Sequence, residues 1–150
     1  MKIKKIFLGA DHAGFELKEH VKKYLLQHGI KVEDKGVFHF NKQDDYPDFI
    51  MPVAEEVAKN PNNKGIIFGA SGQGEAIAAN RIKGVRAALY YGNNMEIVKL
   101  SRTHNNANIL SLGAKFLTKD EAVKAVKLWL NTEFSDESRH IRRIKKIDKT

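Results

Sequence analysis

Two hydrophobic periods alternate along the chain. Five short apolar runs are typical of buried strands, and a segment with a helical repeat follows each of them. In the segment 15–28, for example, Leu17, Val21 and Leu25 recur at the spacing of one helix face. The predicted strands are 4–8, 30–32, 65–68, 85–90 and 108–112. The predicted helices are 15–28, 49–58, 75–80, 93–101, 119–131 and 136–147.

Residues at the element boundaries support this assignment. Gly29 is suited to end the first helix, Pro52 to lie in the first turn of the second, and Thr118 to form a capping box with Glu121. Strands that alternate with helices in this way predict βαβ units, and hence an α/β fold with a mostly parallel sheet covered on both faces. No linker or internal repeat interrupts the pattern. We therefore expect residues 1–150 to form one domain, with 136–150 as a basic C-terminal helix or tail.

The composition is that of an ordinary globular protein, with 42% hydrophobic and 29% charged residues over 150 positions. No apolar run approaches the roughly 20 residues of a membrane span, so we expect no membrane partner. The first residues are basic but lack the apolar stretch of a signal peptide, and we expect a cytoplasmic protein. The chain has no cysteine, which excludes disulfides, thiolate metal sites and thiol nucleophiles.

The net charge of +8 is concentrated near the C-terminus. Residues 139–150 hold six of the 26 basic residues and one of the 18 acidic ones, so 20 and 17 remain and the rest carries +3. The basic segment is short and has no interleaved aromatic residues, so we expect no nucleic-acid partner. Arg139 and Arg143 stand at i and i+4, and this pair suits either a bound phosphate or a solvated basic helix that packs by its isoleucines.

A glycine-rich turn follows the third predicted strand. Gly69, Gly72 and Gly74 precede a helix, where free backbone N–H groups bind anions. The dinucleotide fingerprint would need a glycine at Ile77, and a phosphate-binding Walker loop would need a lysine at Glu75. Nucleotide binding is therefore disfavoured. The turn is either a structural strand-to-helix connection with a surface glutamate or a site in which that carboxylate works.

Glu75 experiences two opposing influences on its pKa. The helix N-terminus lowers the pKa of a carboxyl group, whereas burial in a closed site raises it. A buried carboxylate beside a sugar serves as a general base, and the nearby N–H groups would stabilise an enediolate oxygen. These are the needs of an aldose–ketose isomerase that uses no metal. We expect no metal site, because no His-x-x-x-His or clustered carboxylate spacing is present.

Ligands of open α/β sheets bind at the carboxyl ends of the strands. We expect three groups of residues there: Asp11 with His12, Ser71 with Glu75, and His104 with Asn105 ahead of the fifth strand. Each histidine has an ordinary alternative role as a surface or hydrogen-bonding residue. The segment 101–106 also has an alternative role, as a helix cap.

Six motifs in order carry a resemblance over nearly the whole chain. They are Gly9-Ala-Asp-His-Ala-Gly-Phe15, Asp45-Tyr-Pro47, Gly69-Ala-Ser-Gly-Gln-Gly-Glu-Ala-Ile-Ala-Ala-Asn80, Gly84-Val-Arg-Ala87, Ser101-Arg-Thr-His-Asn-Asn-Ala-Asn108 and Arg139-His-Ile-Arg-Arg143. Together they resemble the sugar-phosphate isomerase family that contains ribose-5-phosphate isomerase B and the galactose-6-phosphate isomerase subunits.

The resemblance implies a Rossmann-like three-layer α/β/α sandwich with a five-stranded sheet. It also implies a homodimer, or else a tetramer, with active sites between subunits. The activity would be conversion of ribose 5-phosphate to ribulose 5-phosphate through a cis-enediolate, without metal or cofactor. Some members place a catalytic cysteine where this chain has Gly69, whereas the pattern seen here implies Glu75 as the base.

The resemblance also implies roles for the other site residues. Ser71 would form an anion hole with the N–H groups of Gly72, Gln73 and Gly74. Either His104 or His12 would open the furanose ring, with a slight preference for His104. The residues implied to contact substrate are Asp11, Tyr46 and Asn105 at the sugar, and Arg139 and Arg143 with His12 or His140 at the phosphate.

Two alternatives to a ribose 5-phosphate isomerase remain open on the sequence. A six-carbon substrate, such as allose or galactose 6-phosphate, would require more room, which the loop 37–45 and the residues near His104 would set. A sugar-phosphate-binding protein without catalysis is the other, although retention of Glu75, Ser71 and Asp11 argues against it.

Overall fold

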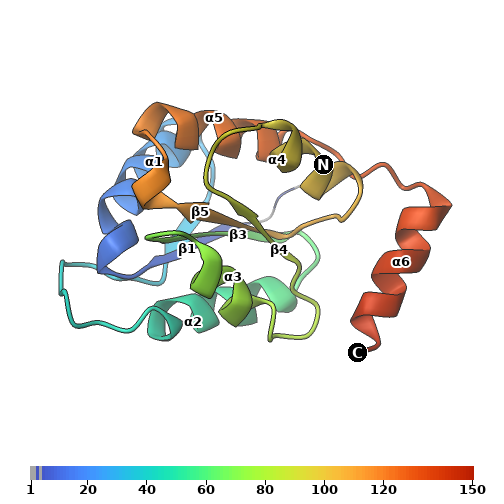
Figure 1. Ribbon diagram of the computed structural model, residues 1–150, viewed down its shortest axis with the longest axis horizontal. Helices are drawn as coiled ribbons and strands as arrows, with labels where there is room; N and C mark the ends of the chain where they lie inside the picture. The colour runs from blue at the N-terminus through green and yellow to red at the C-terminus, as the bar shows by residue number, and fades with distance from the viewer. Residues whose placement is uncertain (1–2, 4) are drawn as a thin grey trace.

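The computed structural model describes Ile3 and residues 5–150, and over these residues the chain forms one five-stranded sheet (Figure 1). The strands are β1 (Lys5–Ala10), β2 (Val32–Asp34), β3 (Asn63–Gly69), β4 (Ala87–Tyr90) and β5 (Ile109–Gly113). Their order is β2-β1-β3-β5-β4, and every adjacent pair is parallel. The prediction of a parallel α/β sheet is confirmed. Lys4, the expected first strand residue, lies outside the described residues.

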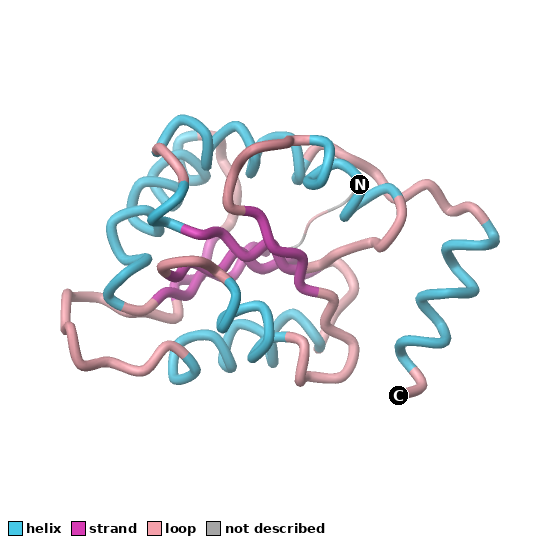
Figure 2. The backbone as a smooth tube through the Cα atoms, in the orientation of Figure 1, coloured by secondary structure: helices cyan, strands magenta, loops and turns pink. Residues whose placement is uncertain are grey.

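Helices cover both faces of the sheet (Figures 1 and 2). They are α1 (Phe15–Gln27), α2 (Pro47–Ala58), α3 (Gln73–Ala79), α4 (Glu96–Thr103), α5 (Lys119–Leu130) and α6 (Ser138–Asp148), with short 3₁₀ helices η1 (His12–Gly14) and η2 (Ala114–Phe116). In Figure 1, α1, α4 and α5 lie above the sheet and α2 and α3 below it. This is the expected Rossmann-like three-layer sandwich.

The central strands lie between two hydrophobic cores. In β1, Ile6 and Leu8 pack toward α1 and α5, where Trp129 is fully buried, whereas Phe7 packs toward α2. The central strands therefore bury successive side chains on opposite faces, which explains their uninterrupted apolar sequence. No helix of the described chain is both long enough and apolar enough to cross a membrane.

The second strand lies two residues later than the sequence predicts. The prediction followed the apolar residues 30–32, but pairing with β1 sets the strand at 32–34, with Ile6 opposite Val32 and Leu8 opposite Asp34. Residue 30 instead takes part in the C-terminal cap of α1, because its N–H donates to Leu25 O after Gly29 turns left-handed at φ 72°.

The start of α2 also differs from its prediction. The helix begins at Pro47, so Pro52 lies inside the helix and Pro47 takes the favourable first position. The start of α4 at Glu96 is likewise later than the predicted 93, because Asn93 has φ 84° and cannot be helical. The capping box of α5 is confirmed: Glu121 N–H donates to Thr118 Oγ1 and Thr118 N–H to Glu121 Oε1.

Candidate active site

The carboxyl ends of β1, β3 and β5 meet at one edge of the sheet. Ala10 lies beside Phe68, and Gly69 beside Gly113. The residues that follow β1 and β3 are therefore neighbours, although about 60 positions separate them in the sequence. The structure thus brings Asp11 and His12 together with the glycine-rich turn, as the strand order requires.

Asp11 is buried and shapes the turn after β1. One oxygen, Oδ1, accepts hydrogen bonds from the backbone N–H groups of Ala13 (3.0 Å) and Gly14 (3.3 Å). It therefore caps η1, which places His12 at the edge of the sheet. Gly14 lies against the backbone of Phe68, and a Cβ there would be 2.5 Å from that carbonyl oxygen.

Glu75 lies in the first turn of α3 and is only 4% exposed. Its carboxyl group lies over Gly69, where a Cβ would overlap it. Burial raises the pKa of Glu75 and the charge of Asp11 raises it further, whereas a backbone hydrogen bond acts in the opposite direction. The net pKa shift is upward, so burial and the charge of Asp11 outweigh the backbone hydrogen bond.

The glycine-rich turn is held in place by a strand on its other side. Gly72 has φ 79°, a conformation that favours glycine, and its carbonyl accepts a hydrogen bond of 2.7 Å from Ser111 Oγ in β5. Within the turn, Gln73 N–H donates to Ser71 Oγ at 3.3 Å. The predicted anion hole of Ser71 with residues 72–74 stays a prediction.

Tyr46, at the start of α2, reaches the same turn. Its phenol packs against Gly74, where a Cβ would lie 2.7 Å from the hydroxyl oxygen. The side chain is about one-third exposed. The structure therefore brings the predicted sugar contact beside the turn that carries Glu75.

The remaining predicted site residues lie at the opposite edge of the sheet, where the strands begin. They are His104, Asn105, Arg139, His140 and Arg143. Because α4 runs back across the sheet, His104 and Asn105 lie where β5 begins, and the expectation that they share the edge of Asp11 is wrong within one chain. Helix α6 lies at this far edge as well, apart from the body of the domain (Figure 1). Asp148 there is 3.8 Å from Arg86, which directly precedes β4.

Among these residues, the rings of His104 and His140 stack with their centroids 4.3 Å apart. His140 is buried; burial lowers its pKa, and the neighbouring charges of His104 and Arg139 lower it further. Arg139 and Arg143 are exposed, and Arg139 is 3.4 Å from Glu137. Asn105 lines a cavity of about 390 Å³ with residues that include Asn80, Arg86 and Ile147.

Known proteins are similar to this chain over almost all of its length. The family model described as ribose/galactose isomerase matches residues 6–147. The chain belongs to this family. Ribose-5-phosphate isomerase B of Mycolicibacterium paratuberculosis is 41% identical over 140 residues, which cover 93% of this chain and 87% of the relative. The predicted family membership is confirmed.

Solved structures of family members have the same fold. A ribose 5-phosphate isomerase from Thermotoga maritima matches with a TM-score of 0.90 and 44% identity, covering 97% of this chain and 98% of the other. Ribose-5-phosphate isomerase B from Mycoplasma genitalium, solved with bound ribulose-5-phosphate, matches with a TM-score of 0.92 and 39% identity, covering 98% and 96%.

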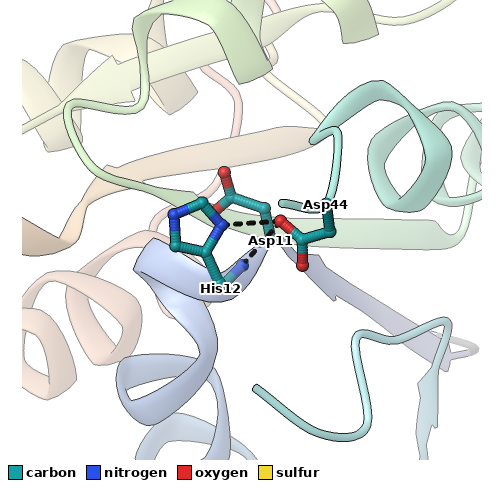
Figure 3. A group of neighbouring side chains, drawn as sticks. All are labelled: Asp11, His12 and Asp44. Atoms are coloured by element: carbon teal, nitrogen blue, oxygen red, sulfur yellow. Dashed lines mark hydrogen bonds and ion pairs between the residues drawn. The ribbon is translucent and has the colours of Figure 1, made fainter. Parts of the chain in front are cut away.

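One residue of this site was not predicted from the sequence. Asp44, from the loop between β2 and α2, joins Asp11 and His12 in a group whose polar atoms lie within 4.8 Å of one another (Figure 3). These donor types suit a divalent cation. However, Oδ1 of Asp11 already accepts hydrogen bonds from the N–H groups of Ala13 and Gly14, and the carboxylate of Asp44 is hydrogen-bonded to His12. Its position two residues before Tyr46-Pro47 was the available signal.

Proposed function

We propose that this chain is a metal-independent isomerase that interconverts ribose 5-phosphate and ribulose 5-phosphate. The observation that carries the proposal is the buried carboxylate of Glu75, with its raised pKa, beside Asp11 and the glycine-rich turn. The names of the relatives and the ribulose-5-phosphate complex of the Mycoplasma genitalium protein support this substrate. A carboxyl group with a raised pKa is suited to take and return a proton near neutral pH.

Glu75 is the general base of the proposed reaction. Its carboxylate takes the C2 proton of the open-chain aldose, a C1–C2 double bond forms, and the carbonyl electron pair moves to O1. Ser71 and the N–H groups of residues 72–74 stabilise the resulting cis-enediolate. A proton then moves from O2 to O1, and Glu75 delivers its proton to C1 to give the ketose.

The furanose ring opens before this step. A histidine takes the O1 proton and returns it to the ring oxygen as the bond from C1 to that oxygen breaks. His12 lies in the same group as Asp11 and is available within one chain. His104 lies at the opposite edge of the sheet, so it fulfils this role only if a second copy of the chain brings it there.

The residues proposed to bind the substrate phosphate also require a second copy of the chain. Arg139 and Arg143 are exposed on α6, and this helix lies apart from α3, the helix that carries Glu75 (Figure 1). We propose that the protein is a homodimer in which α6 and the segment from His104 of one copy complete the site of the other. Two arginines at i and i+4 then bind the phosphate through charge-assisted hydrogen bonds.

The test is proton exchange in Glu75→Gln, which keeps the shape of the side chain and removes the base. We expect this variant to fold, to lose ketose formation, and to lose exchange of the substrate C2 proton with solvent deuterium. The exposed Glu55 of α2 supplies the matched control, Glu55→Gln, which we expect to retain both. Exchange that survives in Glu75→Gln would show that another group is the base.

The substrate is tested with a panel of five- and six-carbon aldose phosphates assayed for ketose formation. We expect ribose 5-phosphate to have the highest kcat/KM. A higher value for allose or galactose 6-phosphate would identify a six-carbon isomerase. Ligand-induced thermal stabilisation without exchange would identify a binding protein.

A further inference from the structure

Asp44 makes two hydrogen bonds to one residue, His12, which is 32 positions away in the sequence. Its Oδ1 atom accepts the backbone N–H of His12 at 3.2 Å and lies 2.6 Å from Nδ1 of the imidazole (Figure 3). The side chain of Asp44 is only 7% exposed. Its second oxygen, Oδ2, is buried and has no hydrogen-bond partner among residues 3 and 5–150. All side-chain hydrogen bonds of Asp44 within the described chain therefore go to His12.

This contact determines which imidazole nitrogen carries the proton. Because Oδ1 already accepts the backbone N–H of His12, it acts as an acceptor toward Nδ1 as well. The neutral ring then has its proton on Nδ1 and a free lone pair on Nε2. Nε2 lies on the side of the ring away from Asp44 (Figure 3) and makes no hydrogen bond within the described residues.

The ring is restrained on a second side by the same loop. Phe40 packs against the imidazole edge-to-face, with centroids 5.8 Å apart. Asp44 and Phe40 both belong to the segment between β2 and α2, which also carries Tyr46. One loop therefore sets both the orientation and the tautomer of His12, whose side chain is 30% exposed.

We propose that Asp44 is a positioning residue, which holds His12 in the Nδ1–H tautomer so that Nε2 accepts a proton from the substrate. The proposal rests on the proposed function for the identity of the substrate, but the tautomer itself is a property of the free protein. It gives His12 the free lone pair that ring opening requires.

The tautomer is measured on the ¹⁵N-labelled full-length protein without substrate, by long-range proton–nitrogen correlation of the histidine rings. The variant His12→Gln assigns the His12 signals. We expect a protonated Nδ1 and an unprotonated Nε2 in the wild-type protein at a pH where the ring is neutral, and loss of this preference in Asp44→Ala. A wild-type Nε2–H tautomer would overturn the proposal, whether or not the protein is an isomerase.

Kinetics separate positioning from a purely structural role. We expect Asp44→Ala to lower kcat roughly 10- to 100-fold, as loss of other residues that orient a functional histidine does. Asp44→Asn keeps an acceptor oxygen and should retain the tautomer and lose less activity, which also covers the case in which Asp44→Ala does not fold. Asp48→Asn, at an exposed carboxylate in α2, is the charge-matched control with unchanged kcat. Loss of kcat in Asp44→Ala with the tautomer unchanged would refute the positioning role.

Discussion

The carboxyl group of Glu75 fills the space in which a side chain on residue 69 would begin. Because position 69 is glycine, α3 can direct this carboxylate back over the end of β3, near Asp11, which follows the neighbouring strand β1. A family member with a cysteine at this position would place its thiol in the same space. With Glu75 as the proposed base, the two arrangements would place the proton acceptor at the same point of the site.

Gly69→Ala tests this relationship directly. The added methyl group overlaps the Glu75 carboxyl, so we expect destabilisation of about 1–3 kcal/mol and a large loss of kcat. Urea unfolding and ketose formation measure the two effects. In the double variant Gly69→Ala with Glu75→Ala the overlap is gone, and much of the stability should return. Additive losses of stability would contradict the contact.

The raised pKa of Glu75 predicts the acidic side of the pH–rate profile. The base must be ionised, so kcat/KM should fall as the pH drops through a pKa above the ordinary 4.5. Burial is the larger cause and Asp11 the smaller one. In Asp11→Asn, the residual activity should therefore show this limb at lower pH. A wild-type limb at or below 4.5 would be inconsistent with the buried carboxylate.

The raised pKa of Glu75 also predicts how the free energy of unfolding changes with pH. Ionising Glu75 costs more in the folded protein than in the unfolded chain, so the penalty is absent well below pH 4.5 and grows until the raised pKa is passed. The stability of Glu75→Gln relative to the wild-type protein should therefore increase as the pH rises over this window. Urea unfolding at a series of pH values measures it, and a constant difference would contradict the shift.

Subunit complementation tests the proposed site between two copies. Glu75→Gln lacks the base and Arg143→Ala lacks a phosphate contact, so each homodimer should have a low kcat/KM. Statistical mixing of the two chains should give hybrids with one intact site in two, or about a quarter of wild-type kcat/KM overall. Each variant mixed with itself is the control. No recovery in verified hybrids would place both residues in one chain's site.

Lys18 is a buried charge that anchors the start of the loop bearing Asp44. It is fully buried, with Nζ 2.6 Å from Asp34 Oδ2, and Asp34 Oδ1 accepts the N–H of Gly36. Burial opposes ionisation of Asp34, but hydrogen bonds from Lys18 and Lys22 outweigh it and lower its pKa. Lys18→Met should therefore cost about 3 kcal/mol of unfolding free energy.

Lys22→Met is the matched control, because Lys22 binds the same oxygen at 2.8 Å from a more exposed position. Its loss should cost at most about 1 kcal/mol. Urea unfolding at neutral pH distinguishes the two variants. Equal losses would show that burial of Lys18 does not set the strength of the pair.

Local patterns predicted the fold well, because strands buried on both faces need unbroken apolar runs and surface helices need a 3.6-residue stripe. The prediction was wrong where pairing overrides hydrophobicity: β2 contains Glu33 and Asp34 because β1 extends that far, and not because they are apolar. The start of α4 was missed because a left-handed asparagine carries no reliable local signal.

The sequence by itself determined the α/β order, the family and the position of Glu75 after a glycine-rich turn, since these depend on residues close together in the chain. Tertiary structure decided that burial raises the pKa of Glu75, that Asp44 binds His12, and that His104 and Arg143 lie at the edge of the sheet opposite Glu75. Each depends on which distant segments the parallel sheet brings to the same edge, and residue spacing along the chain does not encode that directly.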